Sequence, residues 1–241
     1  MRPEAGGYAG RVSGRRKILL SWSSGKDSAW ALHVLRQRGE VEVAGLVTTV
    51  NEVFARVAMH AVREALLERQ AAAAGLPLWK VPIPQPCSNA QYEEAMGALV
   101  ERAVGQGVSA MAFGDLFLAD IRAYRERMLA GSGLTPVFPL WEADTARLAR
   151  EMIAGGLSAV LVCVDPKQLP PAYAGRTFDD RLLAELPSSV DPCGENGEFH
   201  TFCCAGPMFQ RPIPVRSGSS VERDGFVFSD LVLDTQGSAC A

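Results

Sequence analysis

The stretch KILLSWSSGKDSAWALHVLRQRG, residues 17–39, decides the fold of this 241-residue chain. It opens with a short apolar strand, Ile18–Trp22, which runs into a turn of serine and glycine. A helix is expected over Ser28–Arg38, because apolar residues recur there at helical spacing and Gly39 supplies a stop. A strand, a tight polar turn and a helix in this order begin a βαβ unit, and such units build parallel sheets.

The same alternation continues through the next hundred residues. Further strands are expected at Val41–Val50, Leu78–Ile83, Ala110–Phe113 and Pro136–Leu140. The helices between them are expected over His60–Ala74, Ala90–Val104 and Leu118–Ala130. This pattern predicts an α/β domain with a doubly wound, Rossmann-like parallel sheet of about five strands. Ligands of such sheets bind at the carboxyl ends of the strands.

The pattern changes near Glu142. The expected elements beyond it are a helix over Asp144–Ala154, a buried strand over Ala159–Val164 and a short helix over Phe178–Leu186. Residues 187–210 show no periodicity, and Asp224-Gly225 between Ser219–Glu222 and Phe226–Leu233 predicts a β-hairpin. We therefore expect a flexible tail over 1–16, a first domain over 17–142, a smaller α+β domain over 143–234 and a second tail over 235–241.

Composition excludes several classes of protein. Hydrophobic residues make up 48% and charged residues 21% of the chain, which is typical of a globular protein. The 24 basic and 27 acidic residues give a formal charge of -3, which disfavours binding to nucleic acid through phosphates. The longest uncharged apolar stretch, Met152–Val164, is shorter than the roughly 18–20 residues that span a bilayer. We expect a cytoplasmic protein that binds neither membranes nor nucleic acid.

The cysteines and tryptophans favour structural roles. The six cysteines include no C-x-x-C pair, so we expect reduced thiols rather than disulfides or a structural zinc site. The tryptophans expected in the core are Trp22, Trp30, Trp79 and Trp141.

The turn between the first strand and the first helix carries the first candidate chemistry. Along Ser23–Ser28, successive backbone N–H groups and the positive end of the helix dipole favour phosphate oxygens. Gly25 lets the backbone approach an anion closely, and Lys26 adds positive charge. The hydroxyls of Ser23 and Ser28 can donate further hydrogen bonds. A cluster of helix-capping residues is the structural alternative, but the place after the first strand favours a phosphate site.

Asp27 is the exception in this turn, because phosphates repel a carboxylate unless it orients the loop or holds Mg²⁺. The turn is not a Walker A loop, since Leu20 stands where that motif needs glycine. The predicted nucleotide-binding residues are Ser23, Ser24, Gly25, Lys26, Asp27, Ser28 and, after a later strand, Gly114.

Two other places are candidates with an even balance between function and structure. Asp115 follows the strand at 110–113, where it either positions magnesium or an amine, or caps the next helix. Arg122, with Arg125 three residues later, either faces a carboxylate or phosphate or forms an exposed pair with Glu126. His60 is expected to pack or to cap a helix.

The segment GENGEFHT, residues 194–201, is harder to explain by packing. Two carboxylates, an amide and an imidazole stand close together in a stretch without periodicity. Glu195 and Glu198 are expected to bind an ammonium ion, deprotonate it or hold magnesium. His200 is expected to act as an acid or base. The predicted substrate-binding residues are Arg122, Glu195, Asn196 and Glu198.

These motifs resemble those of a known family. Ser23–Ser28 resembles the S-G-G-K-D-S signature of the PP-loop ATP pyrophosphatases, with Ser24 in place of the first glycine. The other motifs, which resemble the diphthine–ammonia ligase family, are RVAMH at 56–60, Phe113-Gly114-Asp115, Pro139-Leu140-Trp141 and above all residues 194–201. The similarity runs from about Lys17 to Phe209.

The resemblance implies a reaction. PP-loop enzymes cleave ATP between its α- and β-phosphates, and the diphthine–ammonia ligases amidate the carboxylate of diphthine on a translation factor with ATP and ammonium. For this chain it implies an ATP-dependent ligase that forms an acyl-adenylate, releases AMP and pyrophosphate, and transfers ammonia or another amine. The acid is either a small molecule or a protein side chain. The Gly-, Ala- and Arg-rich composition favours a bacterial member, and a homodimer is compatible with the sequence.

The cofactors implied are ATP and Mg²⁺, with Asp27 as the metal ligand. The residues expected to be catalytic are Lys26, Asp115, Glu198 and His200. Substitution of Lys26 or Asp27 is expected to weaken ATP use and leave the fold intact, as at an exposed helix start. Glu198→Gln is expected to retain ATP binding and lose amide formation.

Two alternatives remain. One is a PP-loop enzyme that modifies tRNA, against which the pI of about 5.7 and the missing C-x-x-C pair both count. The other is a non-catalytic module that senses adenine nucleotides. ATP consumption that ammonium accelerates would separate a ligase from both.

Overall fold

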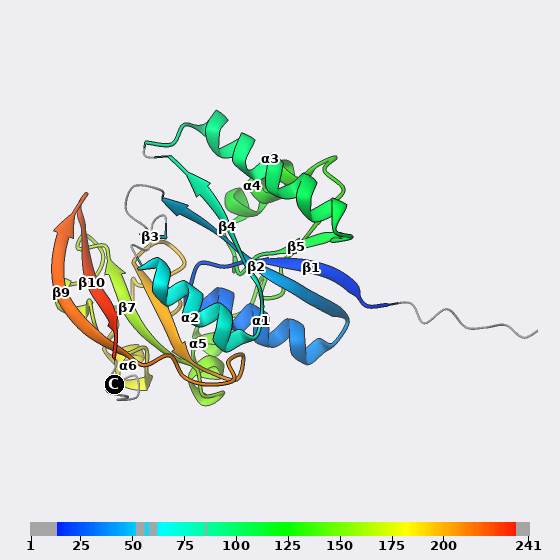
Figure 1. Ribbon diagram of the computed structural model, residues 1–241. Helices are drawn as coiled ribbons and strands as arrows, with labels where there is room; N and C mark the ends of the chain where they lie inside the picture. The colour runs from blue at the N-terminus through cyan, green and yellow to red at the C-terminus, as the bar shows by residue number, and fades with distance from the viewer. Residues whose placement is uncertain (1–13, 52–55, 58–61, 85, 235–241) are drawn as a thin grey trace, which may run out of the picture.

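The computed structural model of the chain describes residues 14–51, 56–57, 62–84 and 86–234 (Figure 1). The first sheet contains β1 (Arg16–Ser21), β2 (Val41–Asn51), β3 (Arg56–Val57), β4 (Leu78–Ile83), β5 (Ala110–Ala112) and β6 (Thr135–Val137). Five of these strands are parallel, in the order β4-β2-β1-β5-β6, and the short β3 pairs antiparallel with the end of β2. The predicted doubly wound sheet is confirmed.

Helices cover both faces of this sheet (Figure 1). The helices are α1 (Lys26–Arg38), α2 (Glu64–Ala74), α3 (Asn89–Gly105), α4 (Ala119–Leu129), α5 (Thr145–Ala154) and α6 (Asp180–Glu185). Their ends follow local sequence: Gly39 ends α1 in the left-handed conformation with φ 64°, and Ser88 begins α3 in a capping box with Gln91. Figure 1 shows α1, α2 and α5 on one face and α3 and α4 on the other.

The alternation of side chains along β1 divides the core into two parts. Ile18 and Leu20 point into a cluster shared with α1, α2 and α5, whereas Leu19 points into a cluster shared with α3 and α4. All three side chains are fully buried. A strand covered on both faces is expected to be a continuous apolar run, which is what this stretch is.

The second sheet is antiparallel, with strand order β8-β7-β10-β9. Its strands are β7 (Ser158–Val164), β8 (Phe199–Ala205), β9 (Val215–Arg223) and β10 (Phe226–Leu233). The predicted hairpin is confirmed, since Asp224 and Gly225 link β9 to β10 with φ values of 54° and 80°. Positive φ at both turn residues is the type I′ pattern that matches strand twist.

The first helix joins the two sheets. It packs against β8, and the Arg36 guanidinium donates to the carbonyl of Met208 just after that strand. On the other side of α1, Trp30 packs against the end of α5. The larger core cluster is therefore continuous from the parallel sheet into the second sheet.

Several expectations need correction. The stretch 187–210 contains strand β8, which the sequence hides because most of its side chains are buried without alternation. The expected fifth strand is shorter and earlier, at β6, and the expected helix at 60–74 begins only at Glu64. Trp141 is half-buried rather than in the core, because it stacks on an arginine.

Among the cysteines that the structure describes, one differs from expectation. Cys87, Cys163, Cys193 and Cys203 are free thiols. Cys204 takes part in a disulfide, so the expectation of reduced thiols is wrong there. His60 and both predicted tails, apart from residues 14–16, lie outside the described residues. Among the described helices, none is both long and apolar enough to cross a membrane.

The contact between α1 and α5 yields a stability prediction. A Cβ added at Gly155 would lie 2.5 Å from Cη2 of Trp30, so Gly155→Ala forces the rigid indole to shift. We expect this change to lower the free energy of unfolding by about 1–3 kcal/mol. Gly97→Ala, in an exposed position of α3 with nothing within 4 Å, should instead raise it by about 0.4–1 kcal/mol.

Urea denaturation of the two variants beside the wild type measures both effects. If Gly155→Ala and Gly97→Ala change the free energy of unfolding equally and in the same direction, the packing of Trp30 against Gly155 is contradicted.

Candidate active site

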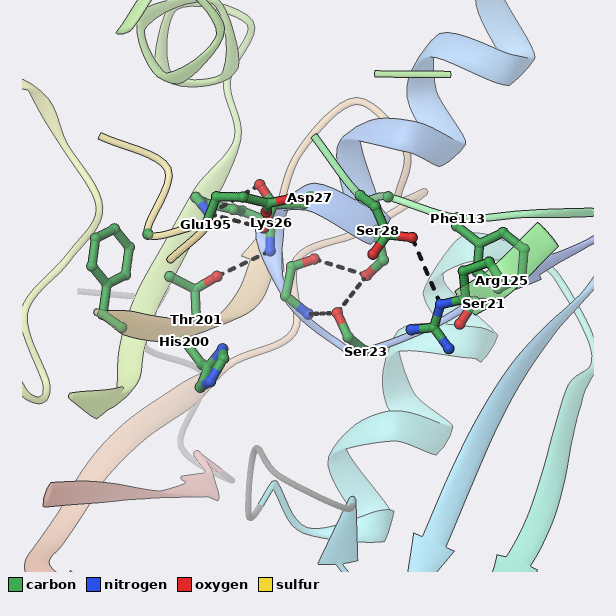
Figure 2. Close-up of a pocket in the computed structure, with 15 residues that line it drawn as sticks. Ser21, Ser23, Lys26, Asp27, Ser28, Phe113, Arg125, Glu195, His200 and Thr201 are labelled. Carbon is green, nitrogen blue, oxygen red and sulfur yellow. Dashed lines mark hydrogen bonds and ion pairs between the residues drawn. The ribbon is translucent and has the colours of Figure 1, made fainter. Parts of the chain in front are cut away.

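A cavity of about 230 Å³ opens at the carboxyl ends of β1 and β5, where α1 begins (Figure 2). Its lining residues are Ser21, Ser23, Gly25, Lys26, Asp27, Ser28, Phe113, Gly114, Asp115, Arg125, Gly194, Glu195, Phe199, His200 and Thr201. The first sheet thus supplies one wall, and the segment leading into β8 supplies the other. This is the switch point of the parallel sheet, where α/β proteins bind ligands.

The turn Ser23–Ser28 has a compact geometry of its own. The Ser23 and Ser28 hydroxyls lie 3.2 Å apart, and the Gly25 N–H donates to the Ser23 hydroxyl at 3.3 Å. Gly25 is needed for close approach, because a Cβ there would lie 3.2 Å from the Thr201 carbonyl oxygen. The Lys26 N–H donates to the Thr201 hydroxyl at 3.0 Å. The turn is therefore built against β8, with the hydroxyls of Ser23 and Ser28 facing the cavity (Figure 2).

Lys26 differs from the expectation of an exposed cation. Its side chain is only 2% exposed, and its ammonium lies 5.5 Å from the ring centres of both Phe178 and Phe199. The Nζ donates to both carboxylate oxygens of Asp27 at 2.9 Å and to the backbone carbonyl of Cys193. The expectation that this helix start is exposed is therefore wrong for Lys26.

The Lys26–Asp27 pair is ionic despite its burial. Burial by itself disfavours the ammonium, but the adjacent Asp27 carboxylate together with the other groups around it, Cys193 and Glu195, raises the pKa of Lys26 above its ordinary value. Burial raises the pKa of Asp27, which Lys26 partly offsets. Buried charges of this kind persist only when they are paired and hydrogen-bonded. The pair ties the first helix to the Cys193 carbonyl on the opposite wall.

Glu195 presents the carboxylate of that wall. Its Oε1 accepts hydrogen bonds from the Leu116 N–H at 2.7 Å and the Phe117 N–H at 3.4 Å, so both walls hold it. Burial raises the pKa of Glu195 to about 7, and the nearby Asp27 adds to the rise, while the Leu116 N–H and Lys26 oppose it. A carboxylate with this pKa exchanges a proton readily near neutral pH.

Glu198 and Asn196 hold the loop rather than line the cavity. Glu198 is fully buried, and its Oε1 accepts from the Asp191 N–H at 2.8 Å and from Nδ2 of the exposed Asn196 at 3.1 Å. Asp191 in turn accepts from the N–H groups of Cys193 and Glu195, both at 3.0 Å. We infer that Glu198, expected to be catalytic, instead shapes the segment that positions Glu195.

His200 lines the cavity from the start of β8. Burial and, to a lesser extent, the positive charge of Lys26 lower the pKa of His200 to about 4, while Glu198 opposes the shift. The imidazole is therefore neutral at physiological pH, which favours hydrogen bonding over charge neutralisation.

Asp115 and Arg125 form the far wall. The Arg125 Nε lies 3.7 Å from Oδ2 of Asp115, and its guanidinium stacks 5.0 Å from the centre of the Phe113 ring. Both atoms are buried without a hydrogen-bond partner among the described residues. Gly114 packs against the start of α1, since a Cβ there would lie 3.0 Å from the backbone of Asp27.

Arg122 lies outside the cavity, although it was expected to bind substrate. Its guanidinium stacks between Phe138 and Trp141, at 5.0 and 4.7 Å from their ring centres, and pairs with Glu126 at 2.8 Å. Arg125, three residues on, is the arginine that faces the cavity. The sequence alone could not distinguish the two arginines. In the structure, Arg122 stacks on Phe138 and Trp141 outside the cavity, whereas Arg125 stacks on Phe113 inside it.

The sequence did not identify Thr201 as a residue that holds the turn Ser23–Ser28. It stood inside the 194–201 motif, but a role for its hydroxyl depends on β8 lying beside the turn Ser23–Ser28. Ser24, expected to bind nucleotide, is fully buried and does not line the cavity.

The donor set suits Mg²⁺ that arrives with phosphates. Among the described residues, no three His, Cys, Asp or Glu side chains converge as a metal-binding group. ATP-bound Mg²⁺ is commonly held by one or two carboxylates together with phosphate oxygens. Asp27 and Asp115 both line the cavity, and Oδ2 of Asp115 is buried without a hydrogen-bond partner among the described residues. These two residues would hold the ion, which would neutralise phosphate charge.

The buried pair makes a prediction about stability. Lys26→Met keeps the length of the side chain but leaves the Asp27 carboxylate unpaired, so the free energy of unfolding should fall by about 3–5 kcal/mol. The double variant Lys26→Met/Asp27→Asn removes both charges and should recover part of this loss. Urea denaturation measures each change.

The control is an exposed ion pair. Arg147→Met breaks the pair with Glu151, in which both side chains are more than half exposed, and should cost less than about 1 kcal/mol. A cost for Lys26→Met no larger than this would contradict a buried ionic pair.

Comparison with known proteins agrees with this arrangement. The family model of the diphthamide synthase N-terminal domain matches residues 16–136, and that of the diphthamide synthase C-terminal domain matches residues 144–230. The chain is 27% identical to the diphthine–ammonia ligase of Bos taurus over 245 residues, which cover 89% of this chain and 88% of the bovine protein.

Two further relatives carry the same name. The diphthine–ammonia ligase of Mus musculus is 28% identical over 245 residues, covering 89% of this chain and 88% of the mouse protein. That of Danio rerio is 32% identical over 120 residues, covering 47% of each chain. Together the two family models account for both sheets, and the cavity lies where residues from the two matched regions meet. The chain therefore belongs to the diphthamide synthase family.

Proposed function

We propose that this chain is an ATP-dependent amide ligase that activates a carboxylate as an acyl-adenylate and transfers ammonia to it. Family membership and relatives named diphthine–ammonia ligase support this class of reaction. The observation that carries the proposal is that Glu195 and the turn Ser23–Ser28 line the same cavity from opposite walls. One wall suits phosphates, and the other suits an ammonium ion.

The first half-reaction uses the wall formed by β1, α1 and α4. The α-phosphate of ATP lies at the start of α1, where the helix dipole and the hydroxyls of Ser23 and Ser28 oppose its charge. Arg125, whose Nε has no hydrogen-bond partner among the described residues, binds the carboxylate to be activated. Attack of a carboxylate oxygen on the α-phosphorus breaks the bond to the β-phosphate bridge and expels pyrophosphate.

The second half-reaction uses Glu195. Ammonium has no lone pair and must lose a proton before it can attack, and the Glu195 carboxylate accepts that proton. Its pKa of about 7 suits the transfer at neutral pH. Ammonia then attacks the acyl carbon, AMP leaves with the electrons of the broken anhydride bond, and the attacking nitrogen gives up its extra proton to the departing phosphate as the amide forms. Neutral His200 serves as a hydrogen-bonding group beside this step.

The acid that is activated is carried by a small molecule or by a protein side chain. Arg125 supplies a cation to the cavity lining, and Glu195 and His200 supply further polar groups, so the shared chemistry is recognition of a carboxylate. The assay below separates the two sources.

Product analysis tests the reaction class. The protein is incubated with ATP labelled at the α-phosphate, with ammonium and with either the small-molecule or the protein fraction of a cell extract. We expect AMP and pyrophosphate in equal amounts, because attack at the α-phosphorus expels pyrophosphate. Chromatography resolves the nucleotides, and a Ser23→Ala/Ser28→Ala variant controls for contaminating enzymes. ADP with inorganic phosphate as the products would overturn the proposal.

Glu195 is tested by separating the half-reactions. Glu195→Gln keeps the shape and the bond from the Leu116 N–H but removes the proton acceptor. We expect kcat for amide formation to fall about 10²–10⁴-fold, while acid-dependent exchange of pyrophosphate into ATP is retained. In the wild type, kcat should rise as pH increases through about 7, because Glu195 must lose its own proton first.

The matched control is Glu101→Gln, at an exposed position of α3. Wild-type amide formation by Glu195→Gln would exclude Glu195 as the proton acceptor. If Glu195→Gln loses both pyrophosphate exchange and amide formation, Glu195 acts in the first half-reaction instead.

A further inference from the structure

Gln70 is a fully buried polar side chain outside the cavity, on α2. Its Oε1 accepts from the indole Nε1 of Trp22 at 2.8 Å. Its Nε2 donates to two backbone carbonyls, that of Ser24 at 2.9 Å and that of Cys203 at 2.6 Å. Both N–H groups of the Gln70 amide are therefore hydrogen-bonded. Because the indole of Trp22 can only donate, the atom facing it must be the amide oxygen, which fixes the orientation of the amide.

These bonds connect three parts of the molecule at one point. Trp22 directly follows β1, Ser24 lies in the turn Ser23–Ser28, and Cys203 lies in β8 of the second sheet. The Ser24 carbonyl accepts a second bond, from the Cys203 N–H at 2.9 Å. Gln70 therefore bridges the one direct backbone pairing described between the turn and β8.

Ser24 needs such support. Its φ is 71°, in the left-handed region that non-glycine residues rarely occupy. Its own hydroxyl is buried and has no hydrogen-bond partner among the described residues, so the side chain does not stabilise this conformation. The two bonds to its carbonyl are the interactions that hold it. Without them, a serine favours a different backbone conformation, which redirects the following Gly25 and the start of α1.

We propose that Gln70 is a positioning residue for the nucleotide: by clamping the Ser24 carbonyl, it holds the turn Ser23–Ser28 in the shape that binds phosphate. This rests on the proposed use of that turn as the nucleotide site. Gln70 itself touches no substrate, so it acts only through the backbone of Ser24. The positive φ at position 24 is unfavourable for serine but not for glycine. The effect of Gln70 on nucleotide binding should therefore depend on which residue stands at position 24.

The experiment is a double-mutant cycle on the full chain, with ATP and MgCl₂ as the probe and calorimetric titration as the readout. Gln70→Met keeps length and burial but removes both donors. It should weaken ATP binding about tenfold, equivalent to about 1.4 kcal/mol. In a Ser24→Gly background, glycine adopts positive φ without cost, so the same substitution should weaken binding less than about threefold relative to Ser24→Gly alone.

A matched control separates positioning from general loss of stability. Leu99→Ala makes a core cavity under α3, in the cluster on the opposite face of the sheet, and should lower the melting temperature at least as much as Gln70→Met. Its ATP affinity should stay within twofold of the wild type. A fall in affinity as large as that of Gln70→Met would overturn the inference.

Two other outcomes are decisive. If Gln70→Met leaves ATP binding intact, the positioning role is overturned. The same holds if Gln70→Met weakens ATP binding equally in the wild type and in the Ser24→Gly variant. Neither result affects the proposed function. A wild-type chain that does not bind ATP overturns the proposed function and with it this inference.

Discussion

The candidate active site depends on one contact, the packing of the turn Ser23–Ser28 against strand β8. The Cys203 N–H donates to the Ser24 carbonyl, the Thr201 hydroxyl accepts from the Lys26 N–H, and the Lys26 ammonium reaches the Cys193 carbonyl. Each bond joins the parallel sheet to the second region. Phosphate-binding turns in α/β proteins are usually shaped by their own glycines, whereas the turn Ser23–Ser28 is also held by a neighbouring strand.

This seating explains the placement of charge. Bringing β8 close removes water from Lys26, and a buried ammonium is tolerated only with a partner, which Asp27 supplies. The same closeness half-buries Glu195 and raises its pKa to about 7. The stability of one charged group and the basicity of another thus share a single cause, which is the exclusion of solvent between the two walls.

Features that depend on residues close together in the chain could be predicted from the sequence, whereas features that depend on contacts between distant residues could not. The βαβ order, the Asp224-Gly225 hairpin and the position of the turn after β1 are local patterns, and they were predicted correctly. Strand β8 was missed, because a strand buried on both sides has no alternation to detect. The choice of Arg125 over Arg122 and the burial of Lys26 depend on residues distant in the chain, which no local pattern contains.

The distance along the chain between the seated partners has a consequence for biosynthesis. Lys26 and Thr201 are 175 residues apart, so the amino-terminal βαβ units emerge from the ribosome long before the strand that completes their turn. Domains generally fold in the order of their synthesis, at roughly 5–20 residues per second. The nascent first sheet therefore waits on the order of ten seconds or more for β8, and until then Ser24 lacks its hydrogen bond from Cys203 and the Lys26 N–H lacks its bond to Thr201. The turn Ser23–Ser28 therefore reaches its final shape only after β8, close to the end of the chain, has been synthesised.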